Sequence, residues 1–492
     1  MAIEYTALAV LVAYFVATLA IGYVAFRRTE NTPTDYFLAN RSFGTAVLMF
    51  TVLATIFSAF LFFGVGAMTY ATGTGVATVF LLGTGAQVFV MYMVGSPFRR
   101  VAKKKSQVSP TEYLEGRFES HVPSVLYTLF AVLFVVPFIA SQILAGGIAL
   151  DILVGIPRDV AIVVLTAIMA AYIVLGGLRA AAWTDVLQGM VLLGALVAGF
   201  GLLVVTFGPT QLTERVLASS PQAFEMPGPR GAWNVRMLVS WMVFFPLGPI
   251  FFPWMLQRWM AAKSDRVLRT ATVWWGLLAM GVAFLAVIIG AWARGLLTQV
   301  PNPDYIVPLV FDSLFPPIVA AVILAGAVAA LQSSAGSFVL GLGGVISRQF
   351  YVGYLAPEAS ADRESTVLKG IVFVLFVASG AIALRPPAGI FSLGANAIAG
   401  FATFAPAFIG GLYWRRTTAP AAAASMLVGA TTVLVYFYGV VPRTLSFGFH
   451  EGFLGVVAAT VVLVVGSVVT STPSETAVRS FTSTWAAAGE DD

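Results

Sequence analysis

The chain contains no cysteine, only two histidines and few charged residues. Each of these features argues against a class of function. Without cysteine there can be no disulfide framework, iron–sulfur cluster or thiol catalysis. The histidines, His121 and His450, fall at expected loop–helix edges, and no HExxH, Walker P-loop or GxSxG motif occurs. The sequence therefore gives little support to a metal-dependent or nucleotide-dependent enzyme.

Long apolar runs dominate what remains. Of the 492 residues, 59% are hydrophobic and 10% are charged, against about 25% charged in a typical soluble protein. The runs suit helices of about 20 residues that cross a bilayer, and they lack the alternation of barrel strands. The composition predicts an all-α polytopic membrane protein. Its net charge of +5 then indicates basic cytoplasmic loops and no nucleic-acid partner.

Polar breaks divide the apolar sequence into about thirteen expected spans. They are 5–26, 43–69, 76–96, 122–150, 158–177, 182–206, 233–260, 267–293, 313–347, 366–384, 390–413, 419–439 and 452–470. With the N-terminus outside, most of the 27 Lys and Arg residues fall in inside loops and the C-terminal tail. We therefore expect one transmembrane domain, 1–470, in the cell membrane, with a short mobile cytoplasmic tail at 471–492.

Two of these spans contain residues that break helices. The span 43–69 includes "FSAFLFFGVG", and the span 233–260 includes "FFPLGPIFFPW". Glycine and proline at membrane depth free backbone carbonyls, and broken helices at corresponding positions of two halves mark transport sites. Simple kinks in packed helices are the alternative. The spacing of the two breaks predicts inverted five-helix repeats with flanking helices. These repeats cover about 43–206 and about 233–413, with extra helices at 5–26, 419–439 and 452–470.

A polar cluster, "AALQSSAGS" at 329–337, lies inside one uncharged run. Ala330, Ser333 and Ser334 follow helical spacing, so they share one face. Two hydroxyls and a carbonyl that face an unwound segment would form a neutral oxygen cage, which suits a small hard cation such as Na⁺. The alternative is close packing, because small residues and hydroxyls also line membrane helix interfaces.

An acidic residue, Asp185 in "GGLRAAAWTDVLQG", lies inside the span 182–206, near its expected cytoplasmic end. Carboxylates inside membrane spans are costly and usually functional. Two roles are open from the residues alone: a charge partner for Arg179, or attraction of a cation that leaves the site inward.

Together these stretches resemble the sodium/solute symporter family, whose members share the LeuT-type inverted-repeat fold. The matching stretches run in the family's order. They are "DYFLANRSFG" (35–44), "ATIFSAFLFFGVGAMTYATG" (54–73), "YIVLGGLRAAAWTDVLQG" (172–189), "PWMLQRWMAAKS" (253–264), "AALQSSAGSFVLGLGGVISRQFY" (329–351) and "GFATFAPAFIGGLYWRR" (400–416).

The resemblance implies Na⁺ as the coupling ion and no organic cofactor. It places the Na⁺ ligands on the backbone carbonyls of Ala54, Phe57 and Ala330 and on the hydroxyls of Ser333 and Ser334. It further associates Asp185 with the inward ion path and places an aromatic inner gate at Trp254.

The substrate is less defined. Leu61, Phe252 and Ala279 stand where sugar-transporting members carry polar groups, and unpaired sugar hydroxyls would be costly there. The positive ends of the broken helices favour an anionic group. The stretch 400–416 resembles the monocarboxylate and pantothenate branches. Candidate substrate-binding or gate residues are Ser58, Gln87, Gln142, Trp254 and Asn396.

We therefore expect sodium-coupled symport of a small, monocarboxylate-like organic acid by alternating access, and no enzymatic activity. An amino acid, pantothenate or another small polar solute is the alternative substrate. The alternatives from another class are a proton-coupled carrier and a ligand sensor. A proton-coupled carrier usually needs an ionisable residue in its core, and a ligand sensor needs a long signalling domain after the last span. We expect neither feature in this chain. The expected partners are the solute and membrane lipid, and whether a small membrane subunit binds stays open.

Overall fold

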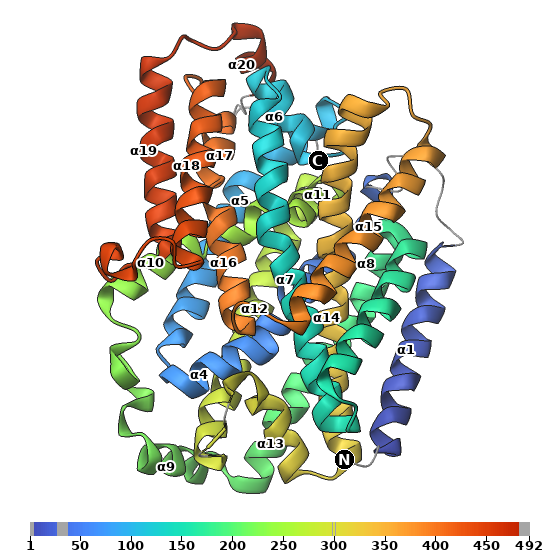
Figure 1. The fold of residues 1–492 in the computed structure, drawn as a ribbon, viewed down its shortest axis with the longest axis vertical. Coiled ribbons are helices and arrows are strands. Elements are labelled where there is room, and N and C mark those ends of the chain that lie inside the picture. Colours follow the sequence, from blue (N-terminus) through green and yellow to red (C-terminus); the bar gives the residue numbers. More distant parts are fainter. Residues whose placement is uncertain (1–3, 27–37, 298, 301, 482–492) are drawn as a thin grey trace.

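The structure is a computed structural model that describes residues 4–26, 38–297, 299–300 and 302–481. It is built from helices that run mostly along the long axis of the molecule (Figure 1). The helices of the first half are α1 (Tyr5–Phe26), α3 (Thr45–Ile56), α4 (Gly66–Thr72), α5 (Val76–Lys104), α6 (Pro110–Phe118), α7 (Val122–Val154), α8 (Arg158–Phe207) and α9 (Pro209–Ser219). Those of the second half are α10 (Val235–Phe244), α11 (Pro253–Ala261), α12 (Asp265–Leu296), α13 (Ile306–Leu314), α14 (Pro317–Ile346), α15 (Ala361–Leu384), α16 (Ile390–Ala402), α17 (Ala405–Tyr413), α18 (Ala419–Phe437), α19 (Glu451–Val469) and α20 (Glu475–Phe481).

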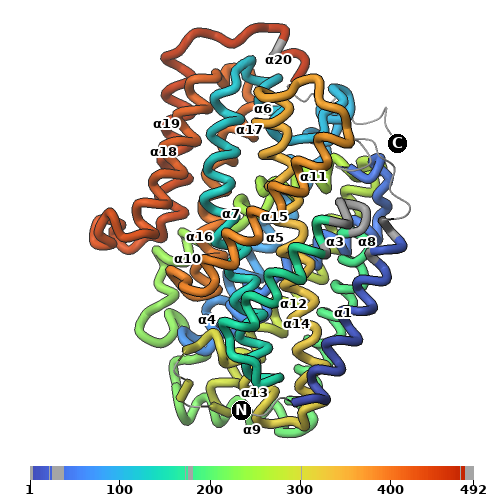
Figure 2. The backbone as a smooth tube through the Cα atoms, turned by 45° about the vertical axis from the view of Figure 1, so that its right-hand side comes forward, coloured from blue at the N-terminus to red at the C-terminus, as the bar shows by residue number. Residues whose placement is uncertain are grey.

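The helix α14 lies at the centre of the bundle. It packs against α8, α7, α1, α11 and α3, and its residues from Ile323 to Val345 are buried without interruption. The pair α18 and α19 lies side by side on one flank, and α1 covers the opposite flank (Figures 1 and 2). The first helix begins near one end of the long axis, whereas α20 lies at the other end.

Both predicted broken helices are present. The segments Thr45–Ile56 and Phe60–Thr72 meet at 51°, and Val235–Phe251 and Pro253–Ala261 meet at 57°. Side chains satisfy the backbone freed at the first break: Ala59 N donates to Gln142 Oε1 (2.9 Å) and Phe60 N donates to Ser58 Oγ (3.1 Å). At the second break, the hydroxyl of Tyr127 donates to the carbonyl of Phe251 (2.7 Å). These bonds replace the helical ladder, as a non-aqueous environment requires.

The predicted number of thirteen spans is not confirmed. Among the described residues, nine helices are long and apolar enough to cross a membrane, or eleven if each bent pair counts as one span. The two expected spans beyond that count are 5–26 and 158–177. The first lies in α1, of which Tyr5–Ile21 is counted as a shorter apolar helix, and the second is the first part of α8. Both run into residues whose side chains lie outside the described part of the chain, 22 and 175–180.

The first part of the expected tail includes a short helix. Residues Glu475–Phe481 form α20, and the Phe481 side chain is buried against Tyr113 of α6, with ring centroids 6.0 Å apart. Val478 and Phe481 are three residues apart, so one helical turn brings both apolar side chains to the same face. Residues 482–492 of the tail lie outside the described residues.

The helix α19 begins at His450, whose side chain is 12% exposed. Gly452 N donates to Nδ1 of His450 (3.1 Å), and the imidazole ring lies beside Trp241 and Phe244, at centroid distances of 5.4 and 4.7 Å. Burial lowers the pKa of His450 from its ordinary value of 6.5; nearby Glu451 partly opposes this shift. The neutral imidazole is therefore the form that the folded protein favours.

We expect acidification to destabilise the protein through this residue. Because the folded-state pKa of His450 is lowered, its contribution to stability is present above about pH 6.5 and is lost as the pH falls. The variant His450→Asn retains an acceptor for Gly452 N and removes the titrating group. Its thermal unfolding midpoint in detergent should fall less on acidification than that of the parent. His121→Asn, at an exposed position, is the control, and an unchanged acid response in His450→Asn would contradict the prediction.

Candidate functional site

Four polar side chains within two turns of α14 each reach a different neighbouring helix. These contacts join Gln332 to Tyr14 of α1 (2.8 Å), Ser333 to Asp185 of α8 (2.5 Å), Ser334 to backbone carbonyls of α3, and Ser337 to Arg258 of α11 (2.6 Å). Buried polar groups require such partners. The polar cluster found in the sequence is thus the place where α14 is held to the elements around it.

The end of α3 and the middle of α14 meet at Ser334. The hydroxyl of Ser334 donates to the carbonyls of Ala54 (3.2 Å) and Thr55 (3.0 Å). The Ala54 carbonyl has lost its helical partner, because Ser58 N donates instead to Ile56 O (2.9 Å). A small cation between these two elements could therefore bind carbonyl oxygens from one and a hydroxyl from the other.

The other sequence-predicted ligands lie around the same junction. Ala330 is buried on α14 one turn before Ser334, and Phe57 is the first residue beyond α3. Ser333 faces α8, because its hydroxyl donates to Oδ1 of Asp185 at 2.5 Å. Both serine hydroxyls thus point at oxygen atoms, and each would have to rotate its proton away to present a lone pair to a cation.

An ion pair that the sequence did not reveal lies beside this junction. Arg258 of α11 donates to Oδ2 of Asp185 (3.0 Å), and the two side chains are 0% and 1% exposed. Asp185 also accepts a hydrogen bond from Thr51 (2.5 Å). No role for Arg258 was predicted from the sequence; the structure places it in the buried helix α11. Arg258 follows Trp254 by four residues, and residues at this spacing share a helical face. This spacing could have indicated that Arg258 lies on the same helix face as the proposed gate residue.

The guanidinium of Arg258 joins three helices. It donates to Thr51 (3.0 Å) and Thr55 (2.8 Å) of α3 and to Ser337 of α14 (2.6 Å), besides Asp185 of α8. A buried charge is tolerated when it is paired and its donors are used in this way. Because the Thr55 carbonyl accepts from Ser334, the ion pair and the ion-binding candidate share a residue.

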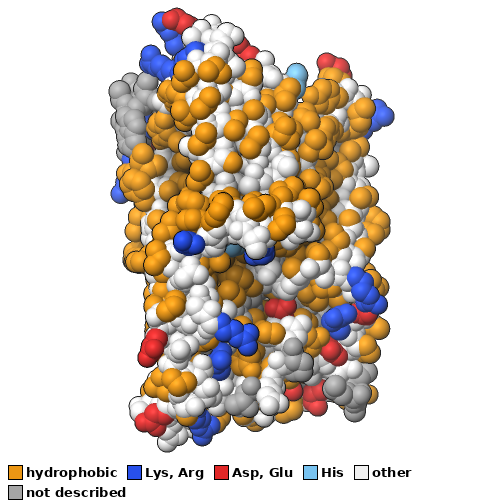
Figure 3. Space-filling model, turned by 60° about the vertical axis from the view of Figure 1, so that its left-hand side comes forward, with side chains coloured by type: hydrophobic (Ala, Val, Ile, Leu, Met, Phe, Trp, Pro, Cys, Tyr) orange, Lys and Arg blue, Asp and Glu red, His pale blue; other side chains and the backbone are white. Residues whose placement is uncertain are grey.

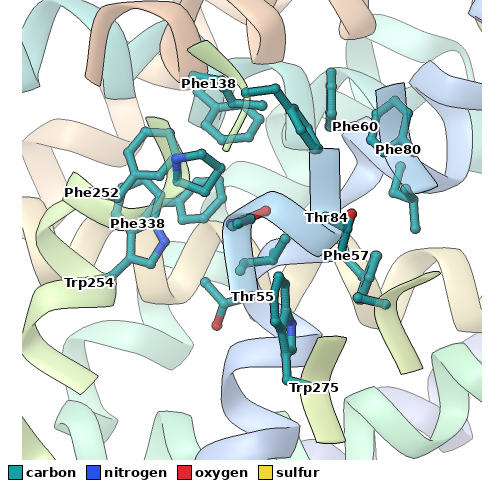
Figure 4. A pocket seen from close by; sticks show the side chains of 17 residues that line it. Thr55, Phe57, Phe60, Phe80, Thr84, Phe138, Phe252, Trp254, Trp275 and Phe338 are labelled. Carbon is teal, nitrogen blue, oxygen red and sulfur yellow. The ribbon is translucent and has the colours of Figure 1, made fainter. Parts of the chain in front are cut away.

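A small cavity of about 40 Å³ adjoins both broken helices. Aromatic rings form most of its wall (Figure 4). Its lining consists of Thr55, Ile56, Phe57, Phe60, Leu61, Phe80, Thr84, Gln87, Phe138, Phe245, Pro249, Phe252, Trp254, Trp275, Ala279, Phe338 and Ile398. Two N–H donors in this wall, Nε2 of Gln87 and Nε1 of Trp275, have no hydrogen-bond partner among the described residues. The lining contains no charged side chain.

The predicted substrate and gate residues divide into two groups. Gln87 and Trp254 line the cavity, whereas Ser58 and Gln142 bond the backbone of the first break. Asn396 is buried outside the lining, and neither of its amide atoms has a partner among the described residues. Polar residue type alone could not separate these roles, because a broken helix needs side-chain partners as much as a substrate does.

Trp254 forms a stack at the cavity wall. Its ring lies 4.2 Å from that of Phe252 and 4.0 Å from that of Phe338, measured between centroids (Figure 4). Gly341 of α14 lies beneath the Trp254 backbone, where an added Cβ would stand 2.8 Å from Trp254 N. The absence of a side chain at Gly341 thus lets α11 approach α14 closely at the cavity wall.

Comparison with known proteins gives consistent matches. The model of the Sodium:solute symporter family matches residues 36–429. The osmoregulated proline transporter OpuE of Bacillus subtilis is 27% identical, over 95% of this chain and 96% of its own length. The sodium/pantothenate symporter of Escherichia coli is 26% identical, over 86% and 89%. A solved structure of a Na⁺-coupled sialic acid symporter aligns with a TM-score of 0.81 at 21% identity, covering 96% of this chain and 99% of that one.

Proposed function

The chain belongs to the sodium:solute symporter family, whose matched relatives are transporters and not enzymes, and we propose that it couples Na⁺ entry to uptake of a small monocarboxylate. The solute would have one carboxylate and an apolar body. The observation that carries this proposal is the pair of unpartnered N–H donors in a mainly aromatic cavity whose lining holds no charged residue.

The donors and the wall favour this chemistry. A carboxylate accepts hydrogen bonds and donates none, so the Gln87 amide and the Trp275 indole complement it. Rings of residues such as Phe60, Phe80 and Phe138 suit the apolar remainder of the solute. An amino acid would also bring an ammonium group, and the lining offers it no carboxylate.

We propose that Na⁺ binds between α3 and α14, with the carbonyls of Ala54, Phe57 and Ala330 and the hydroxyls of Ser333 and Ser334 as ligands. Coupling to Na⁺ is favoured over coupling to protons, because the buried carboxylate near this place, Asp185, is already paired with Arg258. In this proposal Asp185 acts on the inward ion path.

The proposed topology follows the charge pattern. We place the N-terminus outside and the C-terminus in the cytoplasm of a cell-membrane protein, because basic residues concentrate in cytoplasmic loops. The two broken helices would open two inverted repeats, about 43–206 and about 233–413. Trp254, at the inner side of the cavity, would then serve as the aromatic gate toward the cytoplasm during alternating access.

Uptake into proteoliposomes tests the proposal with a matched pair of solutes. Cyclopentanecarboxylate and proline have similar shapes, but only proline carries an amine. We expect the carboxylate to accumulate when a Na⁺ gradient is imposed and not when only a pH gradient is imposed. Accumulation of proline but not of cyclopentanecarboxylate would refute the monocarboxylate assignment and favour the substrate of the matched proline transporters.

The membrane potential gives a second readout. A monoanion that moves with one Na⁺ carries no net charge, so uptake should respond weakly to a potential set with valinomycin and K⁺. A zwitterion that moves with one Na⁺ would gain about 2.3 kcal/mol per 100 mV, or about fifty-fold accumulation. A response of that size for the accumulated solute would contradict electroneutral uptake of a monocarboxylate.

Substitution of Gln87 tests the proposed carboxylate contact. Gln87→Leu should raise the KM for the carboxylate about 10- to 100-fold, because a hydrogen bond to a charged group is worth about 1.5–3 kcal/mol. Gln87→Glu keeps the size of the side chain and adds a negative charge, so it should impair a monocarboxylate more severely. Thr78→Val, on the same helix but outside the lining, is the control. Improved uptake of a substrate in Gln87→Glu would indicate an amine in place of a carboxylate.

A further inference from the structure

A second hollow, far from the aromatic cavity along the chain, lies where α17, α19 and α20 come together. It has a volume of about 410 Å³ and is lined by Arg415, Arg416, Thr472, Pro473, Glu475, Val478 and Arg479. Three guanidinium groups therefore face one space together with one carboxylate. The carboxylate is already engaged, because Glu475 pairs with Arg479 at 3.1 Å. The positive charge of Arg415 and Arg416 has no counter-charge within the lining, which favours an anion there.

Arg416 is held in a fixed orientation. Its Nη2 donates to the carbonyls of Val468 (3.0 Å) and Thr470 (2.9 Å) at the end of α19. Its Nη1 is buried and has no hydrogen-bond partner among the described residues. A guanidinium with one nitrogen anchored and the other unused is preorganised to donate to an oxyanion, and buried unused donors are rare without such a partner.

The position of the hollow points to a membrane lipid. It lies at the end of the apolar helix α19, at the level where a span leaves the hydrocarbon region. Val461, Val464, Val465 and Val468 of α19 are 46–60% exposed and follow one helical face toward this end. Figure 3 shows hydrophobic side chains over much of the surface, with charged side chains gathered mainly toward the two ends of the molecule. An acyl chain could lie along this valine strip while its phosphate reaches the arginines.

The hollow also joins the body of the protein to its tail. Arg479 and Glu475 belong to α20, whereas Arg415 and Arg416 follow α17. The same short helix buries Phe481 against α6, and Lys105 lies 5.1 Å from the centre of that ring. An anion in the hollow would offset the repulsion between arginines of the two parts and stabilise α20 on α6.

We propose that this hollow binds the phosphate of an anionic phospholipid, and that the bound phosphate fixes the C-terminal helix α20 against α6. Lipid headgroups and free phosphate share this chemistry, but the valine strip is useful only to a lipid. The site is independent of the solute and ion sites proposed above.

The test compares the full chain with two variants of equal charge. Arg415→Gln/Arg479→Gln removes two exposed basic residues of the hollow, and neither residue anchors the backbone carbonyls that Arg416 holds. Lys104→Gln/Arg363→Gln removes two exposed basic residues elsewhere on the face that we expect to be cytoplasmic. Each protein is placed in nanodiscs of phosphatidylcholine mixed with phosphatidylglycerol, and retained lipid is measured by native mass spectrometry after extraction.

We expect the parent and the control variant to retain phosphatidylglycerol, and the hollow variant to retain at least tenfold less. A basic residue near an anionic surface is worth about fivefold in binding. Equal retention by the two variants would overturn the proposal. In a second arm, inorganic phosphate is added to the detergent-solubilised proteins at constant ionic strength. Thermal stabilisation of the parent by inorganic phosphate, without selective retention of phosphatidylglycerol, would overturn the lipid as the source of the anion.

Discussion

Asp185→Asn is expected to lower the free energy of unfolding by about 3–5 kcal/mol and to abolish transport, because it leaves the Arg258 guanidinium buried without a counter-charge. The effect should be large since both side chains are at most 1% exposed. The ion pair between α8 and α11 is lost as well, while Arg258 keeps its hydrogen-bond partners on α3 and α14. Thermal unfolding in detergent and uptake into proteoliposomes measure the two consequences separately.

A double-mutant cycle distinguishes a lost ion pair from general damage. Asp185→Asn combined with Arg258→Gln removes both charges, so the double variant should recover part of the stability lost by either single variant. Arg443→Gln disrupts a pair in which the arginine is 70% exposed, and it should cost no more than about 1 kcal/mol. Strictly additive losses in the double variant would show that Asp185 and Arg258 contribute independently.

Ser334→Ala is expected to raise the Na⁺ concentration for half-maximal uptake by about 10- to 100-fold while the protein remains folded. This range follows from a contact to a charged group worth about 1.5–3 kcal/mol. The hydroxyl lies within 3.2 Å of the two α3 carbonyls, so its removal takes away one proposed Na⁺ ligand without adding bulk. The measurement is solute uptake as a function of Na⁺ concentration at constant ionic strength.

Ser425→Ala provides the matched control for this substitution. Ser425 is equally buried, and its hydroxyl also donates to a helix carbonyl, that of Ala459 at 2.7 Å, but it joins α18 to α19. Both variants should lose a similar amount of thermal stability, and only Ser334→Ala should change the Na⁺ dependence. An unchanged apparent Na⁺ affinity in Ser334→Ala would remove Ser334 from the proposed ion site.

The broken helices could be predicted because their cause is local. Ser58 with the following glycines, and the proline-rich stretch 246–253, interrupt the helical ladder wherever the chain places them. The structure bends at both places. The number of spans was harder to predict, because the length of an apolar run does not show where one helix ends and the next begins. The expected spans 158–177 and 182–206 both lie within the single helix α8.

The candidate site could be predicted only in part. Helical spacing placed Ser333 and Ser334 on one face, and Ser334 indeed meets the end of α3. The partner of Asp185 could not be found in this way, because Arg258 lies 73 residues away and belongs to a helix whose position depends on the whole fold. The same limit applies to Ser58 and Gln142, since residue type does not reveal whether an amide or hydroxyl serves the backbone or a ligand.

The way in which α14 divides its polar contacts among four helices affects how the protein can move. When one neighbour shifts during a transport cycle, the polar contact that it gives up is that of a single residue of α14, worth about 1–3 kcal/mol. The remaining contacts keep the central helix in register. The bundle can therefore rearrange by breaking these polar contacts one at a time, with a small energy cost at each step, while α14 keeps its position at the centre.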